Sequence, residues 1–215
     1  KQSQFNYKKS LNLINKHSDK LNFLIKNIFF LIFSFFITTL GHTQVYLDWA
    51  INPTDLSAWE QNASSIVTDN SGNIYITGYY AGTVDFDPSS GIFNLTSVGG
   101  NDIFIAKYND AGQLIFAKSI GGSSGEAGNF IILDASGNIY ICGYFNGTVD
   151  FDPSTSNAYL TCSGGSDVFF AKYDNNGNYI YAKSFPGINI DNGAALTIDD
   201  LGNVFITGYF WGGVD

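Results

Sequence analysis

The 215-residue sequence contains no arginine and no methionine, and it has only two histidines and two cysteines. Both histidines, His17 and His42, stand near the N-terminal end, so residues 44–215 contain none. This absence excludes a histidine general base and histidine metal ligands from that part of the chain. The same part has four lysines as its only cations, and nucleic-acid binding requires clustered positive charge. We therefore expect no nucleic-acid partner.

Residues 1–43 differ in composition from the rest. They hold six lysines and a single acid, Asp19, followed by the uncharged run IFFLIFSFFITTL at Ile28 to Leu40. A helix over this run reaches only about 20 Å, whereas the hydrocarbon core of a bilayer is roughly 30 Å thick. A basic segment, a short apolar core and small residues predict a secretory signal peptide over residues 1–43, cut before Gln44. An uncleaved anchor is the alternative.

Export changes the charge of the protein. After residue 43, four lysines face 18 acids, which gives a net charge of −14 (4 − 18). Such an acidic surface disfavours anionic membranes, so we expect no membrane insertion once the signal peptide is removed. The expected location is extracellular, either secreted or at the cell surface.

One phrase recurs along the chain at a constant interval. GTVDFDPSS begins at Gly82, GTVDFDPST begins at Gly147, and the last residues are GGVD. Within these phrases Asp85, Asp150 and Asp215 are separated by steps of 65 residues (from 85 to 150 and from 150 to 215). A fixed step of this kind predicts a repeat architecture, in which each unit packs on its neighbours.

Within each unit the side chains alternate with a period of two, and β-branched and aromatic residues dominate. Turn phrases such as NSGN, ASGN and NNGN separate these runs, with glycine where a short hairpin needs a positive φ. The pattern therefore predicts an all-β fold with four strands in each unit. The strands expected in the two full units are Ser64–Thr68, Asn73–Phe86, Asp102–Tyr108 and Gln113–Ser119, then Asn129–Leu133, Asn138–Phe151, Asp167–Tyr173 and Asn178–Ser184.

Four antiparallel strands per repeat favour a β-propeller over the alternative, a β-solenoid, whose rungs are usually shorter. We expect an end strand of a preceding or closing blade near 45–51, followed by blades over about 60–120 and 125–186 and a half blade over about 190–215. Propellers close with roughly 4 to 8 blades. The propeller over residues 44–215 is therefore expected to be incomplete, either as a fragment of a longer reading frame or as a ring finished by other chains.

The phrases DxxGNIYITGY, GTVDFDP and GGxDxFxAKYD, followed by an aromatic-AKS strand and a GG turn, resemble the SBBP-type β-propeller repeat of bacterial exported proteins. The resemblance covers roughly residues 48–215. It implies a secreted or surface propeller that is often one part of a longer chain. The resemblance implies little about activity, because most proteins that carry these repeats are of unknown activity.

The VDFDP phrase is the main candidate for chemistry, because its aspartates recur in each unit. Paired carboxylates can hold Ca²⁺, which takes oxygen ligands. The interpretation that we favour is that the phenylalanine packs between blades while the aspartates bond the backbone of the following turn. Accordingly we expect no metal or other cofactor, with calcium as the alternative. The calcium candidates are Asp85, Asp87, Asp150 and Asp152.

No catalytic residue is expected, because an active site is normally built once whereas these aspartates recur in every unit. Cys142 and Cys162 correspond to Thr77 and Ser97 of the first unit, so the fold does not require a disulfide, and their pairing stays open. The function that we expect is a non-enzymatic scaffold for binding or adhesion, with a glycan or a protein as ligand. The alternative is a polysaccharide hydrolase or lyase whose catalytic residues lie outside this sequence.

Overall fold

The structure is a computed structural model that describes residues 61–212. The expected signal peptide at 1–43, the expected end strand near 45–51 and Asp215 lie outside these residues. Within residues 61–212 every helix or strand is a β-strand, and there are fourteen of them. The expectation of an all-β fold is therefore confirmed for the described part of the chain.

The first full unit forms one antiparallel sheet with strand order β1-β2-β5-β6. Its strands are β1 (Gln61–Thr68), β2 (Ile74–Tyr80), β5 (Asp102–Tyr108) and β6 (Leu114–Gly122). Two short strands of the next unit, β9 (Thr148–Asp150) and β10 (Tyr159–Thr161), extend this sheet to six strands. They attach through β6, where Gly121 pairs with Asp150 and Gly122 with Val149.

The second unit repeats the same order in a four-stranded sheet, followed by a two-stranded sheet. The strands of the former are β7 (Ala127–Leu133), β8 (Ile139–Phe145), β11 (Asp167–Tyr173) and β12 (Tyr179–Phe185), and those of the latter are β13 (Asn192–Ile198) and β14 (Val204–Tyr209). The register also repeats, because Ile74 pairs with Tyr108 and Ile139 pairs with Tyr173. Equivalent residues in the two units therefore occupy equivalent places in their sheets.

Two strand predictions, at equivalent places in the two full units, were wrong. The run expected to be continuous from Asn73 to Phe86 ends at Tyr80, because Gly82 adopts a φ of 80° and turns the chain. The run expected from Asn138 to Phe151 breaks in the same way after Phe145, where Gly147 has a φ of 63°. In the first unit the VDFDP phrase then begins in a separate short strand, β3 (Thr83–Asp85), which pairs with β4 (Asn94–Thr96). The long connection after VDFDP is thus the return arm of a small hairpin. The second unit forms the same hairpin from β9 and β10.

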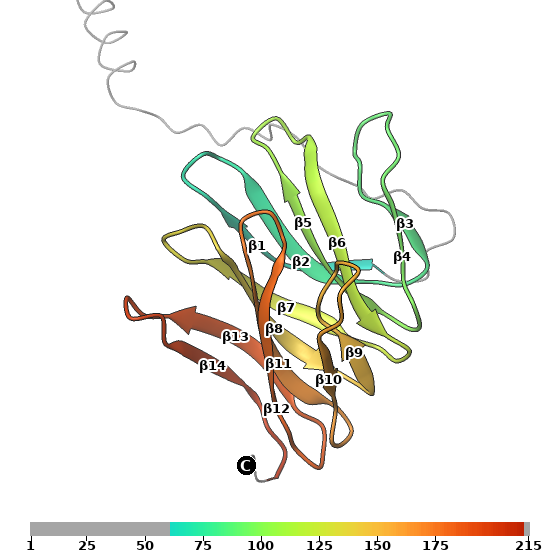
Figure 1. The fold of residues 1–215 in the computed structure, drawn as a ribbon, viewed down its shortest axis with the longest axis vertical. Coiled ribbons are helices and arrows are strands. Elements are labelled where there is room, and N and C mark those ends of the chain that lie inside the picture. Colours follow the sequence, from blue (N-terminus) through green and yellow to red (C-terminus); the bar gives the residue numbers. More distant parts are fainter. Residues whose placement is uncertain (1–60, 213–215) are drawn as a thin grey trace, which may run out of the picture. The chain divides into compact units, whose positions relative to one another are not determined.

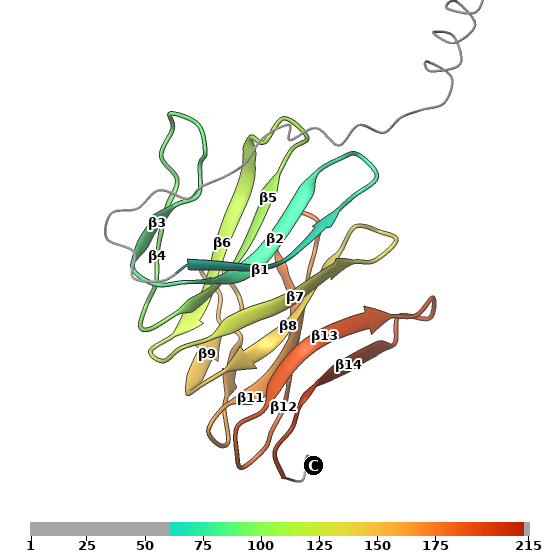
Figure 2. The ribbon, with the colours of Figure 1, turned by 180° about the vertical axis from the view of Figure 1, so that it is seen from behind.

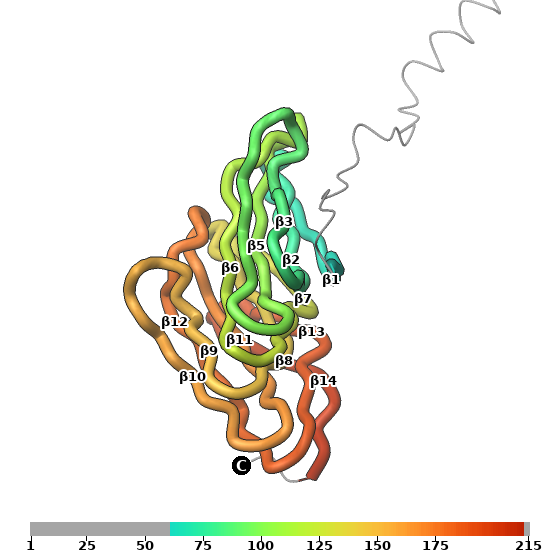
Figure 3. The backbone as a smooth tube through the Cα atoms, turned by 90° about the vertical axis from the view of Figure 1, so that its right-hand side faces the viewer, coloured from blue at the N-terminus to red at the C-terminus, as the bar shows by residue number. Residues whose placement is uncertain are grey.

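Successive sheets contact each other mainly through their first strands. Strand β7 packs against β1 and β2, and β13 packs against β7 and β8. Figures 1 and 2 show this arrangement from opposite sides, with β1, β7 and β13 following one another. In the view of Figure 3, the β9–β10 hairpin lies at the side of the second sheet.

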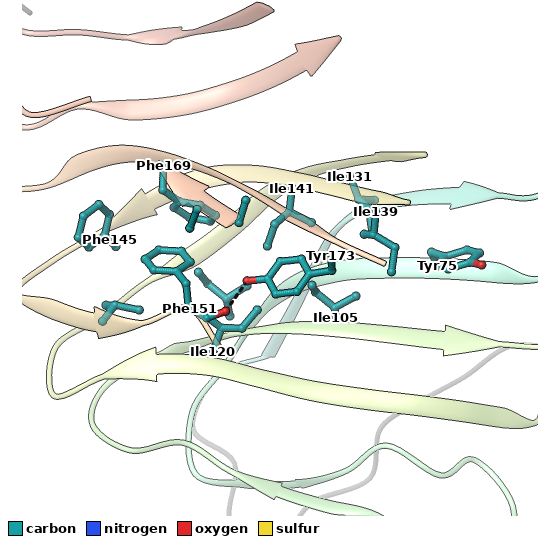
Figure 4. Close-up of a cluster of buried hydrophobic side chains, with 14 residues drawn as sticks. Tyr75, Ile105, Ile120, Ile131, Ile139, Ile141, Phe145, Phe151, Phe169 and Tyr173 are labelled. Atoms are coloured by element: carbon teal, nitrogen blue, oxygen red, sulfur yellow. Dashed lines mark hydrogen bonds between the residues drawn. The ribbon is translucent and has the colours of Figure 1, made fainter. Parts of the chain in front are cut away.

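The main core fills the space between the first two sheets (Figure 4). The first sheet contributes isoleucines such as Ile105 and Ile120, the second contributes Phe145 and Phe169, and Phe151 comes directly after β9, all at most 1% exposed. The ring of Phe151 lies 4.9 Å from that of Phe169 and 5.6 Å from that of Phe145, measured between centroids. Burying each such side chain stabilises the fold by roughly 1.5–3 kcal/mol. The phenylalanine of VDFDP is therefore a core residue, as the favoured interpretation predicted.

Candidate functional site

The DxxGN phrases form tight hairpin turns at one end of the sheets. In the first turn, Asp69 Oδ1 accepts hydrogen bonds from the backbone N–H groups of Ser71 (2.9 Å) and Asn73 (3.0 Å). Asp69 Oδ2 accepts a third, of 2.8 Å, from the amide side chain of Asn73. Gly72 completes the turn with a φ of 79°, which few residues other than glycine adopt. Burial alone would raise the pKa of Asp69, but these hydrogen bonds outweigh burial and lower it.

The same turn recurs wherever the phrase recurs. Equivalent hydrogen bonds form around Asp134, Asp174 and Asp199. These phrases are therefore structural turns, as the sequence indicated, and their first aspartate is committed to the backbone of its own turn.

Two grooves lie between neighbouring turns, and we call them the turn grooves. The first, of about 550 Å³, lies between the β1–β2 turn and the β7–β8 turn, with Asp69, Ser71 and Asn175 in its lining. The second, of about 690 Å³, lies between the β7–β8 turn and the β13–β14 turn. Ser136 lines both grooves, because its turn stands between them.

Each turn groove contains a lysine whose ammonium group lies over a tyrosine ring. Lys107 Nζ is 4.7 Å from the ring centre of Tyr75, and Lys172 Nζ is 4.7 Å from that of Tyr140. Lys172 also forms an ion pair of 3.4 Å with Asp134. The interaction with Tyr140, followed by that with Asp134, raises the pKa of Lys172, so this amine stays charged at neutral pH. The Lys172 amine therefore suits binding and charge balance better than nucleophilic catalysis, which needs a lowered pKa.

The VDFDP carboxylates lie apart from the turn grooves and bond their own hairpin. Asp85 Oδ1 accepts hydrogen bonds from the backbone N–H groups of Asp87 (3.0 Å) and Phe93 (2.8 Å), and Asp87 Oδ1 accepts one from Ser89 (2.9 Å). In the second unit Asp150 and Asp152 accept the equivalent bonds. This is the backbone-bonding role that the sequence favoured. Calcium binding at these four residues stays an untested prediction.

The two cysteines do not pair in the structure. Cys142 is fully buried in β8, and burial raises the pKa of its thiol to about 12. A thiol of that kind is inert, because the thiolate is the reactive form. In this structure, therefore, Cys142 and Cys162 are free thiols and form no disulfide.

Sequence reasoning missed a set of buried acids at the other end of the sheets. Asp102 and Asp167 begin β5 and β11, while Glu126 and Asp191 immediately precede β7 and β13, and all four are at most 1% exposed. Each pair keeps the 65-residue step (102 to 167 and 126 to 191). The recurrence of an acid after 65 residues could have revealed these positions. The phrases around Glu126 and Asp191, SGEAG and NIDNG, differ too much to align by eye.

Residues 61–212 contain neither a membrane-spanning helix nor a cluster of metal-ligating side chains. No helix in this range is long and apolar enough to cross a membrane. No group of three or more histidine, cysteine, aspartate or glutamate side chains is placed to hold a metal ion there.

Comparison with known proteins shows two similarities and no match to any family model. The chain is 32% identical over 155 residues to the uncharacterized WD repeat-containing protein L264 of Acanthamoeba polyphaga mimivirus. It is 23% identical over 142 residues to the regulatory protein FlaEY of Caulobacter vibrioides. These matches cover 68% and 66% of this chain, and they span only 11% and 15% of the two relatives. The likeness therefore concerns the repeat-bearing part, and the activities of the whole relatives do not transfer.

Proposed function

We propose that residues 44–215 belong to an exported β-propeller of the SBBP type, with the first two sheets as successive blades and β13–β14 as the start of a third. Each full sheet has its four strands in the same order and register, and each later unit packs its first strand on the preceding sheet. Propeller blades are four-stranded sheets arranged in this way around an axis. The similarity to a WD repeat-containing protein supports the same architecture, because WD repeats build propeller blades.

The role that we propose for this propeller is non-enzymatic binding at or outside the cell surface. The observation that carries it is the pair of turn grooves, which present the same groups twice. Each offers a turn aspartate, a serine hydroxyl and a lysine held over an aromatic ring. A surface that repeats its groups is suited to a ligand that also repeats, or to an extended one.

A glycan fits the chemistry of these grooves best, and a protein segment is the other candidate ligand. Sugar hydroxyls both donate and accept hydrogen bonds, and the grooves offer carboxylate and carbonyl acceptors beside hydroxyl and ammonium donors. We assign no catalysis to residues 61–212, because the repeated aspartates bond the backbone of their own turns.

The test is a binding screen of the full chain on immobilised polysaccharides and proteins, followed by two matched variants. Ser136 is exposed and lines both grooves, so Ser136→Trp is expected to fill them and to remove binding. Ala111 occupies the same position in the β5–β6 turn, where its N–H bonds Asn109, and it lines neither groove. Ala111→Trp should therefore bind normally. Equal binding by both variants would show that the ligand does not use the turn grooves.

A further inference from the structure

The buried acids form two equivalent junctions between neighbouring sheets. In the first, the N–H of Glu126 donates a hydrogen bond of 2.8 Å to the carbonyl of Asn101, the residue before Asp102. In the second, the N–H of Asp191 donates one of 2.9 Å to the carbonyl of Ser166, the residue before Asp167. We call the Asp102–Glu126 and Asp167–Asp191 pairs the acid junctions. The backbone hydrogen bond places Glu126 beside the start of β5, which begins with Asp102. It likewise places Asp191 beside the start of β11, which begins with Asp167.

Each acid junction contains a buried carboxylate oxygen without a hydrogen-bond partner. Glu126 is 0% exposed, and its Oε2 accepts a bond of 3.3 Å from the N–H of Gly122, while Oε1 has no partner. Asp191 is 1% exposed, and its Oδ1 accepts a bond of 2.8 Å from Trp211, while Oδ2 has no partner. Among residues 61–212, Glu126 Oε1 and Asp191 Oδ2 are the only buried side-chain N or O atoms without a hydrogen-bond partner. They stand at one position of the repeat although one acid is glutamate and the other aspartate.

The glycines at each junction keep the two acids close to one stretch of backbone. A Cβ added to Gly121 would collide with the carboxyl group of Asp102, and one added to Gly187 would collide with Asp191 Oδ2. The N–H of Gly187 also donates to Asp167 Oδ1 at 3.2 Å, so both acids of the second junction contact this residue. The space that a side chain would fill is therefore occupied by carboxyl groups.

Two buried carboxyl groups side by side are costly unless something offsets their charge. Burial raises the pKa of Glu126 to about 7 and the charge of Asp102 adds to this effect, against a hydrogen bond from Gly122 that lowers it. A buried carboxylate oxygen without a hydrogen-bond partner either carries a proton or binds a cation. The VDFDP aspartates differ, because none of them has a buried side-chain oxygen without a hydrogen-bond partner.

We propose that each acid junction binds a divalent cation of the Ca²⁺ type, which links the end of one sheet to the start of the next. Ca²⁺ takes six to eight oxygen ligands, of which two carboxylates supply part, and backbone carbonyls and water supply the rest. The position equivalent to Glu126 in the first unit is Gln61, an uncharged isostere. The inference is independent of the turn grooves, which lie at the opposite end of the sheets.

The test is calcium titration of the full chain by calorimetry and thermal unfolding at neutral pH, after treatment with EGTA. The expected result is two Ca²⁺ per chain, one at each junction. At about 100-fold excess over the dissociation constant, the melting temperature should rise by roughly 5–10 °C for each occupied junction. Glu126→Gln should fold, because glutamine stands at this position in the first unit, and should reduce the stoichiometry to one. The double variant with Asp191→Asn should bind none.

The matched control is Asp85→Asn with Asp150→Asn, which alters the calcium candidates of the VDFDP phrases and should leave both cations bound. Three results would overturn the proposal. One is the absence of both binding heat and a change in melting temperature at millimolar calcium, which would show that the junctions hold a proton instead. The second is unchanged stoichiometry in Glu126→Gln. The third is loss of calcium in the control, which would place the cation at VDFDP.

Discussion

The phenol of Tyr173 in β11 donates a hydrogen bond of 2.9 Å to the backbone carbonyl of Phe151, inside the core between the first two sheets (Figure 4). Tyr108 makes the same bond, of 3.0 Å, to Phe86 in the first unit. The bond ties the VDFDP hairpin to the third long strand of its own unit, β11 in the second unit and β5 in the first. It explains why the repeat keeps both phrases, since the phenylalanine fills the core and its carbonyl needs the tyrosine.

Tyr173→Phe should destabilise the protein by about 1–2 kcal/mol, because it leaves the buried carbonyl of Phe151 without a partner. The measurement is the free energy of unfolding from urea denaturation. Tyr159→Phe is the control, because Tyr159 is 62% exposed and its hydrogen bond to Asn157 lies at the surface. Equal effects of the two substitutions would contradict the structural role of the buried bond.

Phe151→Ala should cost roughly 3–5 kcal/mol, because the ring is fully buried between two other phenylalanines and its removal leaves a cavity. Phe93→Ala should cost far less, because Phe93 is 41% exposed. Denaturation of both variants gives the comparison. A loss of less than about 1 kcal/mol at Phe151 would mean that VDFDP does not contribute to the core.

Gly137→Ala should destabilise the protein by about 1–2 kcal/mol, because the glycine has a φ of 78° that alanine adopts only with strain. Steric collision is not the cause, since the added Cβ would approach Asn175 Cβ only to 3.8 Å. Gly125→Ala is the matched control, because its φ is not positive and its Cβ would meet only Asn101 N, at 3.9 Å. Differential scanning calorimetry should give a lower melting temperature for Gly137→Ala than for Gly125→Ala. Equal melting temperatures would refute the assignment of Gly137 to a turn that needs a positive φ.

Stability should depend on pH through Glu126 when divalent cations are removed. Its pKa is raised to about 7 in the folded state from an ordinary value of 4.5, so folding favours the protonated form. The stabilisation is complete below pH 4.5 and is lost as the pH rises through 7, by on the order of 2 to 3 kcal/mol. The lowered pKa of turn aspartates such as Asp69 acts only at more acidic pH. Thermal unfolding in EGTA should show this loss in the native chain, and a Glu126→Gln variant with the same slope would contradict it.

The repeat, the strands and the DxxGN turns could be predicted because each rests on local chemistry. Glycine at the positive-φ position and aspartate at the start of the turn determine the hairpin around Gly72 whatever surrounds it. The burial of Phe151 was also predictable, because its neighbours in sequence alternate with it. These local sequence patterns predict the structure correctly because the turn and strand preferences that they express agree with the overall fold.

The acid junctions and the turn grooves could not be predicted in the same way, because both arise between units. Glu126 lies beside the start of β5 only because the chain passes there from β6 of the first sheet to β7 of the second. Ser136 lines two grooves only because its turn stands between two others. The breaks at Gly82 and Gly147 were missed because a glycine inside an apolar run does not show by itself whether the strand continues.

The most direct test of the repeat architecture is the pattern of backbone nuclear Overhauser effects in the full chain. The structure pairs strands within a unit, so contacts should link β8 to β11, with Gly143 opposite Phe169, and β2 to β5, with Gly78 opposite Phe104. A β-solenoid would instead pair equivalent strands of successive units. Contacts that link β2 to β8 along their length, in place of these, would contradict the propeller and the grooves and junctions that depend on it.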